Sequence, residues 1–308
     1  MALTSALALG LIATIAGIDT LTSEATAFTS RPQTAASRVA AAAPSPSASP
    51  SPSASPSPSP SNAAEPAPVA QSGQGAGSSP TQGSSQVVPP VALGTTATAP
   101  VTAESGRVGV LFTGSTPTAN HTCSASVLHS STKNLVLTAA HCVSATPAGL
   151  LFAPGYRNGQ TPSGVWQVTK VFLADGWTAS GDQDEDYAIL QIAENGTTNI
   201  EDAVGGTVLG LDAPFTDTVR LYGYPDSAEL PLLCTNVTSR QDTFQRRIDC
   251  PSYSGGTSGG PFIDTDTNQV IGVIGGYQQG GDTDDTSYGA YFDHTIGTLY
   301  QQAVSASS

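Results

Sequence analysis

A serine flanked by glycines is the first residue whose setting suggests chemistry. Ser258 lies in the sequence GTSGGP, residues 256–261, directly before an apolar pair at 262–263. Glycine adopts backbone conformations that a Cβ forbids, and a glycine-rich turn leaves amide N–H groups free to face a ligand. Such turns are common, so the segment predicts a nucleophilic hydroxyl only if a base and a carboxylate occur elsewhere in suitable settings.

His141 has the setting of a general base. It follows an apolar segment at 134–138 and directly precedes Cys142, whose disulfide would hold the loop and hence the imidazole in one place. The other histidines are interpreted as surface or structural residues because no comparable setting surrounds them. They are His121, His129 and His294.

Asp186 has the setting of a partner for that base. It ends an acidic run at 182–186 and directly precedes the apolar segment 187–190. A carboxylate at the start of a buried strand is partly withdrawn from water and therefore needs a donor, such as a histidine N–H. The chain order His141, Asp186, Ser258 thus predicts a base, an orienting carboxylate and a nucleophile.

The first hundred residues differ in composition from the rest. Residues 1–30 contain an apolar stretch followed by small residues, which predicts a secretory signal peptide, although no basic residue precedes the stretch. Residues 31–100 are mostly Ala, Pro, Ser, Gly, Gln and Thr, a composition that buries too little apolar surface to offset the entropy of ordering. We therefore expect a disordered spacer or pro-region at 31–100 and one globular domain at 101–308.

The four cysteines all lie in the expected domain, at Cys123, Cys142, Cys234 and Cys250. An even number behind a signal peptide favours disulfides, and of the three pairings the chain order favours two local loops, Cys123–Cys142 and Cys234–Cys250. Each such loop contributes about 3 kcal/mol in the chain-entropy model. A zinc site is disfavoured because no C-x2-C spacing occurs, and calcium because the acidic runs lack the spacing of a ligand loop. We expect no metal and no cofactor.

The charge balance restricts the partners. The chain has 24 acidic and 10 basic residues and a formal net charge of −14. An acidic surface repels phosphate backbones and anionic lipids, which argues against nucleic acid and membranes as partners. We expect a secreted, extracellular monomer.

Short apolar runs separated by turn residues predict strands throughout the domain. The runs lie at 107–113, 123–129, 134–138, 149–153, 165–173, 187–193, 206–210, 218–223, 232–238, 244–249, 261–264 and 269–275. A 3.6-residue apolar period occurs only at 295–304, which predicts a short C-terminal helix. This pattern predicts an all-β fold that closes as barrels or as a sandwich.

Three segments resemble the signature segments of the chymotrypsin/trypsin-like serine proteases, most closely those of the secreted bacterial branch. They are TAAHC at 138–142, DYAIL at 186–190 and GTSGGP at 256–261, in the same order. The resemblance extends over about 105–302. It implies two six-stranded antiparallel β-barrels with the active site between them, in agreement with the strand count, and it implies protein or peptide substrates.

The resemblance also implies a role for each residue. Ser258 would attack a carbonyl, His141 would take its proton and pass it to the leaving group, and Asp186 would orient the imidazole. The backbone N–H groups of Gly256 and Ser258 would form the oxyanion hole. The substrate-binding residues would be Ser252, Gly275, Gly276 and Tyr277.

Several positions depart from the family pattern. Thr257 replaces the aspartate that animal members pair with a newly formed α-amine, so activation by that ion pair is not expected. The family's groove strand Ser-Trp-Gly reads Gly275-Gly276-Tyr277, which removes a hydroxyl that often supports the catalytic aspartate. Ser252 replaces the aspartate that binds Arg or Lys, and the sequence therefore predicts an uncharged P1 residue.

Two other functions fit parts of the sequence. The pattern G-x-S-x-G at 256–260 also occurs in α/β-hydrolases such as serine esterases, with the order Ser258, Asp284, His294. A nucleophile near the C-terminus without helix–strand alternation does not suit their doubly wound sheet. The second alternative is a catalytically silent relative that only binds protein, and such relatives usually lack a triad residue.

Overall fold

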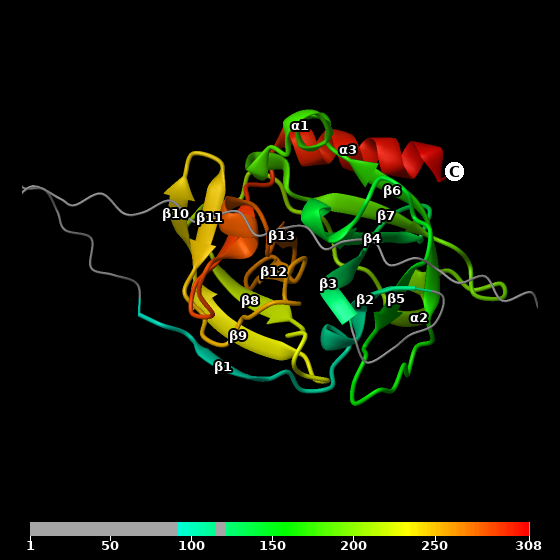
Figure 1. Ribbon diagram of the computed structural model, residues 1–308, viewed down its shortest axis with the longest axis horizontal. Coiled ribbons are helices and arrows are strands. Elements are labelled where there is room, and N and C mark those ends of the chain that lie inside the picture. The colour runs from blue at the N-terminus through cyan, green and yellow to red at the C-terminus, as the bar shows by residue number, and fades with distance from the viewer. Residues whose placement is uncertain (1–91, 115–120, 308) are drawn as a thin grey trace, which may run out of the picture. The chain divides into compact units, whose positions relative to one another are not determined.

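The computed structural model describes residues 92–114 and 121–307 (Figure 1). Six strands of its first half form a closed antiparallel barrel in the order β2-β3-β4-β7-β6-β5. They are β2 (Val108–Thr113), β3 (His121–Leu128), β4 (Leu135–Thr138), β5 (Leu150–Pro154), β6 (Trp166–Leu173) and β7 (Ala188–Ile192). The predicted all-β fold and its first six-stranded barrel are confirmed.

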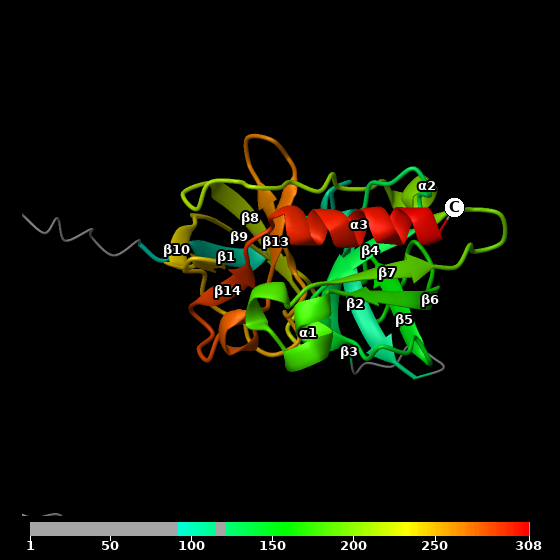
Figure 2. The ribbon, with the colours of Figure 1, turned by 90° about the horizontal axis from the view of Figure 1, so that it is seen from above.

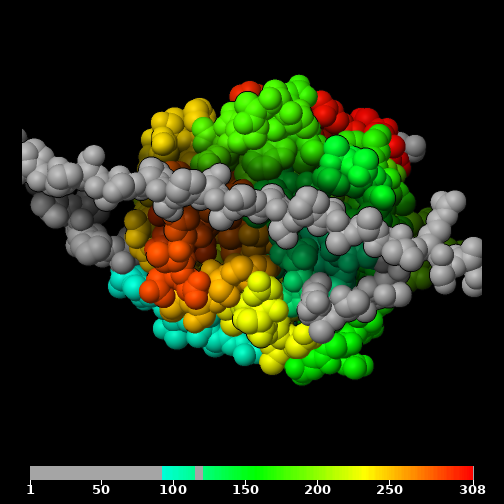
Figure 3. All heavy atoms as spheres, in the orientation of Figure 1, coloured from blue at the N-terminus to red at the C-terminus, as the bar shows by residue number. Residues whose placement is uncertain are grey.

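The second half contains two antiparallel sheets, with the strand orders β1-β9-β8-β12-β13 and β10-β11-β14. The strands are β1 (Thr95–Thr98), β8 (Thr218–Gly223), β9 (Leu232–Val237), β10 (Ser239–Asp242), β11 (Gln245–Ile248), β12 (Pro261–Asp264), β13 (Val270–Val273) and β14 (Ser287–Ala290). The space-filling view in Figure 3 shows the two halves next to each other on one face of the molecule. Atoms of the second half are yellow and orange, and atoms of the first half are teal and green.

No continuous ladder of strand pairs closes the second half into a barrel. Only Thr238 separates β9 from β10, so one bent strand runs through both sheets. On the other side the sheets meet again just beyond β13, where the backbone N–H of Gly275 donates to Tyr288 O at 3.0 Å. The bend at Thr238 and the end of β13 at Val273 interrupt the ladder that a closed barrel needs.

The segment 206–210 is not the strand that its sequence predicts. Thr207 forms an isolated parallel bridge to Leu128 of β3, and Leu209 forms one to Val270 of β13. The segment crosses from the first half to the second, so its backbone groups pair with two different strands and extend neither ladder. It therefore acts as a linker that is bonded to both halves.

Successive side chains along a strand point to opposite faces. The buried side chains of the first barrel therefore pack either inside the barrel or at the interface with the second half. In β2, Leu111 points into the first barrel, whereas Val110 and Phe112 point toward the second half. There they belong to the same buried cluster as Tyr222 and Tyr224. Each fully buried side chain of this size contributes about 1.5–3 kcal/mol. Burial between the halves thus fixes their relative position, and with it the groups that each half contributes to the site.

The C-terminal helix α3 (His294–Ala306) covers both halves on one side, as Figure 2 shows. Its buried residues Ile296, Leu299 and Ala303 pack in one cluster with residues of β4 and β7 in the first half and β13 in the second. Asp293 caps the helix, because its side chain accepts the Thr295 N–H at 2.7 Å. The predicted C-terminal helix is confirmed.

The other helices are short. They are α1 (Asp175–Ser180), α2 (Ile200–Val204) and the 3-10 turns η1 (Ser105–Arg107), η2 (Ala140–Cys142), η3 (Gln183–Glu185) and η4 (Tyr277–Gly280). Among the residues that the structure describes, no helix has the length and apolar character needed to cross a membrane.

The predicted boundary between spacer and domain at residue 100 is wrong, because residues 92–100 belong to the folded part. β1 pairs with β9 in antiparallel register, with Thr95 opposite Thr235. Gly94 packs so closely on a disulfide that a Cβ at this position would lie 2.5 Å from Cys234 Sγ. Ala99 is 1% exposed. The globular part therefore begins at or before residue 92.

The composition of β1 explains the error. Its sequence TTAT consists of the same small and hydroxylated residues as the preceding spacer, and its short edge strand has no alternating apolar pattern. The predicted signal peptide at 1–30 and the predicted spacer up to residue 91 lie outside the described residues.

Candidate active site

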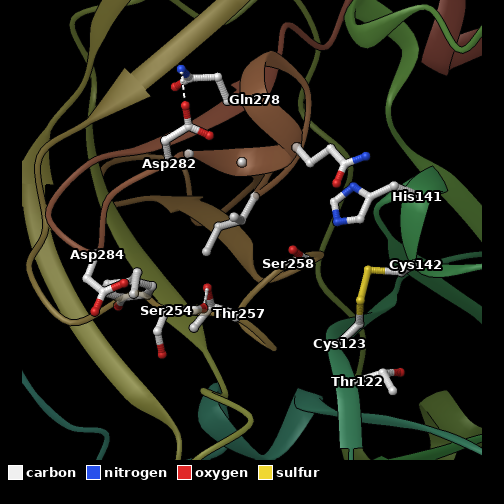
Figure 4. Close-up of a pocket in the computed structure, with 16 residues that line it drawn as sticks. Thr122, Cys123, His141, Cys142, Ser254, Thr257, Ser258, Gln278, Asp282 and Asp284 are labelled. Carbon is white, nitrogen blue, oxygen red and sulfur yellow. Dashed lines mark hydrogen bonds between the residues drawn. A yellow bond between two sulfur atoms is a disulfide. The ribbon is translucent and has the colours of Figure 1, made fainter. Parts of the chain in front are cut away.

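A pocket of about 610 Å³ lies where the first half meets the second (Figure 4). The first half contributes the segment Thr122–Cys123 and the pair His141–Cys142. The second half contributes residues within 253–258 and 278–284, together with Ile274. The volume is in the range of small-molecule and peptide side-chain sites, and the lining contains both Ser258 and His141.

His141 and Asp186 form a hydrogen-bonded pair at this pocket. His141 Nδ1 lies 2.7 Å from Asp186 Oδ2, and the backbone N–H of His141 donates to Asp186 Oδ1 at 2.9 Å. The Asp186 side chain is 1% exposed and that of His141 is 14% exposed. Because a carboxylate oxygen accepts, Nδ1 is the donor, and Nε2 of the neutral ring is left as an acceptor.

The acidic run at 182–186 is folded so that it presents Asp186 to His141. Asp182 caps η3 by accepting the Asp184 N–H at 3.0 Å. Glu185 Oε2 accepts the Gly176 N–H at 2.6 Å. β7 begins two residues after Asp186, so the carboxylate lies between a capped turn and a buried strand.

A backbone N–H replaces the hydroxyl that the sequence lacks next to Asp186. Gly276 N donates to Asp186 Oδ2 at 2.8 Å. A Cβ at Gly275 would lie only 3.1 Å from the same oxygen, which leaves little room for a serine side chain. Asp186 thus accepts three N–H donors, which satisfy the hydrogen-bonding needs of a buried carboxylate.

Gln245 links the Asp186 loop to the strand end that carries Gly276, and no local sequence pattern marks it for this role. Its Nε2 donates to Gln183 O at 2.9 Å and to Asp184 Oδ1 at 2.7 Å. Its Oε1 accepts the Tyr277 N–H at 3.0 Å. The residue is 3% exposed. A buried amide with donor and acceptor both used fixes the spacing of the two segments.

The turn around Ser258 is held by hydrogen bonds to its carbonyl groups. Gly255 O accepts the Asp226 N–H at 2.8 Å, and Ser258 O accepts the Ser124 N–H at 2.7 Å. Gly256 has a φ of 88°, and a Cβ there would lie 2.4 Å from Asp226 N, so both conformation and contact require glycine.

The same turn leaves two donors unused. Neither the Gly256 N–H nor the Ser258 N–H bonds to another group in the described part of the chain. Ser258 and His141 line the same pocket (Figure 4), and the Ser258 hydroxyl has no hydrogen-bond partner among the described residues. A hydroxyl with two free N–H groups beside it is the arrangement that addition to a carbonyl requires.

None of the four predicted substrate-binding residues lines the pocket. Ser252 is exposed and has a φ of 76°, which turns the chain outward. Gly275 and Gly276 are buried beside Asp186. Tyr277 packs edge-on against Tyr288, with ring centroids 5.0 Å apart. The turn η4 begins directly after Gly276, so the extended groove strand ends there and these residues lie outside the pocket lining.

Tyr253 lines the pocket where Ser252 was expected. The Tyr253 hydroxyl donates to Leu221 O at 2.6 Å. Burial raises the pKa of this hydroxyl, which therefore remains a donor. Tyr253 takes the place expected for Ser252 because the positive φ at Ser252 leaves its own side chain exposed and directs the next side chain into the pocket.

Two carboxylates, Asp282 and Asp284, line the pocket on the side opposite His141 (Figure 4). Asp282 Oδ2 accepts from Gln278 Nε2 at 2.5 Å, and both aspartates are exposed. The described lining includes no lysine or arginine. The acidic run was visible in the sequence, but its spacing did not reveal that it faces the pocket.

Both predicted disulfides are confirmed. Cys123–Cys142 joins β3 to the turn η2 that carries His141, and Cys234–Cys250 lies under Gly94. Cys123, His141 and Cys142 have the spacing of a metal-ligand group, but the sulfur–sulfur bond leaves neither cysteine a thiolate for zinc.

The alternative triad with the order Ser258, Asp284, His294 is not assembled. His294 begins α3, its side chain is 89% exposed and its Nδ1 lies 3.6 Å from Asp293 Oδ2. It does not line the pocket that contains Ser258.

Comparison with known proteins agrees with this geometry. The family model of the trypsin-like peptidase domain matches residues 123–273. No curated protein matches the chain in sequence.

Three solved structures resemble the chain. Protease Anisep from Arthrobacter nicotinovorans has 23% identity and a TM-score of 0.57, covering 66% of this chain and 98% of its own. The thermostable serine protease AL20 from an extremophilic microorganism has 25% identity and a TM-score of 0.57, covering 66% and 99%. A Glu endopeptidase has 19% identity and a TM-score of 0.56, covering 70% and 98%. The barrel, the pocket and these matches agree: residues 123–273 match the trypsin-like peptidase domain, and the fold resembles that of known serine proteases.

Proposed function

We propose that this protein is a secreted serine endopeptidase that acts through Ser258, His141 and Asp186. Ser258 Oγ attacks the carbonyl carbon of a peptide bond while His141 Nε2 takes its proton. His141 then gives the proton to the leaving amine as the acyl-enzyme forms. A water molecule, deprotonated by His141, hydrolyses the ester and regenerates Ser258. Asp186 holds the imidazole in the required tautomer throughout.

The observations that carry this proposal are the His141–Asp186 pair, with an Nδ1–Oδ2 distance of 2.7 Å, and the presence of His141 and Ser258 in the lining of one pocket. The unused N–H groups of Gly256 and Ser258 support an oxyanion hole. A catalytically silent protein-binding relative would not need a free hydroxyl, an oriented base and two free donors together. An esterase needs the same groups, so hydrolysis of amide substrates separates it from an endopeptidase.

The test is labelling by a serine-directed fluorophosphonate. We expect the folded protein to be labelled stoichiometrically and to cleave an unfolded protein substrate, and we expect Ser258→Ala to lose both properties. Ser254→Ala is the matched control, because Ser254 lines the same pocket but has no base beside it. Folded wild-type protein that takes up no label would contradict the proposal and favour the silent relative.

We also propose that the pocket prefers a cationic P1 side chain, in place of the uncharged residue inferred from Ser252. Asp282 and Asp284 line it, and no basic residue of the described lining offsets their charge. An anionic P1 residue would be repelled, so glutamate is not the expected P1 residue even though the fold resembles that of a Glu endopeptidase. The carboxylates are exposed, so each is expected to contribute at most about 1 kcal/mol.

This preference predicts a difference between substrates. Peptides with Arg or Lys at P1 should have a higher kcat/KM than peptides with Leu or Glu, and the advantage should shrink as salt screens the carboxylates. Asp282→Asn and Asp284→Asn should each reduce the advantage by up to about fivefold. Asp285→Asn, in the same run but outside the pocket lining, should leave it unchanged. A preference for Leu or Glu in the wild-type protein would disprove the assignment.

A further inference from the structure

Ser124 of β3 connects the first half of the molecule to the turn that carries Ser258. It is fully buried, with 0% exposure. Its hydroxyl donates to Gly256 O at 3.0 Å and accepts the Tyr224 N–H at 2.8 Å. Its backbone N–H donates to Ser258 O at 2.7 Å. One residue of the first barrel therefore binds carbonyl groups on both sides of Thr257.

The turn is one that needs such a restraint. Gly255 and Gly256 lack a Cβ, so rotation of their peptide groups meets little steric resistance. Among the described residues, the only other hydrogen bond on the peptide group between Gly256 and Thr257 is a longer one, from Thr257 N to Ser254 O at 3.3 Å. A rotation there would also change the direction of the neighbouring N–H groups. The Ser124 hydroxyl opposes that rotation through the Gly256 carbonyl.

The Tyr224 N–H gives the hydroxyl its direction. Because this N–H occupies an acceptor lobe of Ser124 Oγ, the hydroxyl proton is left to point at Gly256 O. The strand end at Tyr224 also lies against the turn, since a Cβ at Gly256 would approach Tyr224 O to 2.8 Å. The Ser124 hydroxyl of the first half thus contacts two segments of the second half, Tyr224 just beyond β8 and the turn at Gly256.

We propose that Ser124 is a positioning residue for the oxyanion hole. Its hydroxyl holds the Gly256 carbonyl so that the N–H groups of Gly256 and Ser258 face the oxygen on which negative charge develops. This inference rests on the proposed hydrolase function. Donors oriented before the reaction stabilise the transition state more than the bound substrate, so Ser124 affects kcat and leaves KM nearly unchanged.

Ser126 provides a matched control in the same strand. It is two residues further along β3, so its side chain lies on the same face, and it is 1% exposed. Its hydroxyl has no hydrogen-bond partner among the described residues. Ser126→Ala therefore removes the same group from a similar environment without affecting the turn.

The experiment compares Ser124→Ala with Ser126→Ala and the wild-type protein on one peptide substrate. We expect Ser124→Ala to lower kcat by about 10- to 100-fold, less than the loss typical of removing an oxyanion donor itself. KM should change by less than about twofold. A peptide trifluoromethyl ketone, whose adduct with Ser258 places an oxyanion in the hole, should lose affinity in parallel with kcat. Ser126→Ala should match the wild type in all three measurements.

Each outcome bears on one claim. Wild-type protein that neither turns over substrate nor takes up fluorophosphonate would overturn the proposed function. Active wild-type protein with equal kcat in both serine variants would overturn only the role of Ser124. Equal losses in kcat, substrate binding and ketone binding would indicate a structural role and would also overturn it. If Ser124→Ala does not fold, Ser124→Cys, which keeps a weaker donor, should show a smaller loss confined to kcat and ketone affinity.

Discussion

Replacing Asp186 by asparagine is expected to lower kcat by about 10⁴-fold, the loss typical of this substitution in Ser-His-Asp hydrolases. The asparagine amide would present an N–H group to His141 Nδ1, which now donates to Asp186 Oδ2 at 2.7 Å. The imidazole would then have to carry its proton on Nε2, where it cannot accept the proton of Ser258. The Gly276 N–H, 2.8 Å from the same oxygen, would also face a donor.

The matched control is Asp182→Asn in the same acidic run. Asp182 caps η3, and asparagine is an equally good capping residue, so activity and stability should both stay near the wild-type values. Steady-state kinetics on a peptide substrate and thermal melts of both variants make the comparison. If Asp186→Asn kept a tenth or more of the wild-type kcat, the role given to Asp186 would be wrong.

Removing either disulfide is expected to cost about 3 kcal/mol of unfolding free energy, because the two loops have similar lengths, with sequence separations of 19 and 16. For a domain of this size that loss lowers Tm by about 6–12 °C. The effects on activity should differ. Cys123–Cys142 holds the turn next to His141 and lines the pocket, whereas Cys234–Cys250 does not line it.

Double alanine variants of the two pairs test this difference below their melting temperatures. Loss of Cys123–Cys142 should lower kcat by about 10- to 100-fold, because small displacements of a catalytic group cost this much. Loss of Cys234–Cys250 should leave kcat within about twofold of the wild type. Equal kcat values for the two variants would show that the first disulfide does not position His141.

The strands of the first barrel could be predicted from sequence because each is a short apolar run between turn residues. Besides β1, two strands were missed, and neither has such a run. β10 reads SRQD and β14 reads SYGA, and both pair with β11. Segment 206–210 has the composition of a strand, but its pairing partners lie in different halves. Tertiary pairing, which a local pattern does not contain, decided all three cases.

The residues of the candidate site also fall into two groups, those that the sequence predicts and those that only the structure reveals. Ser258, His141 and Asp186 lie in recognisable local settings; Ser258 and His141 line one pocket, and Asp186 accepts a hydrogen bond from His141. Ser124 and Gln245 act through hydrogen bonds to residues more than fifty positions away, and nothing in their own neighbourhood marks them. The pocket lining was missed for a conformational reason, since a residue with positive φ, Ser252, reverses which side chain points inward.

The pairing of β1 with β9 limits where the N-terminal part of the chain can be trimmed. A cut before residue 92 would leave β1 intact on the sheet. A cut beyond Thr98 would remove it, and the backbone N–H and C=O groups of β9 that now pair with β1 would be left open. Unpaired groups on an exposed sheet edge recruit strands from other chains, so an over-trimmed protein should self-associate. Trimming that stops upstream of β1 would therefore avoid this self-association.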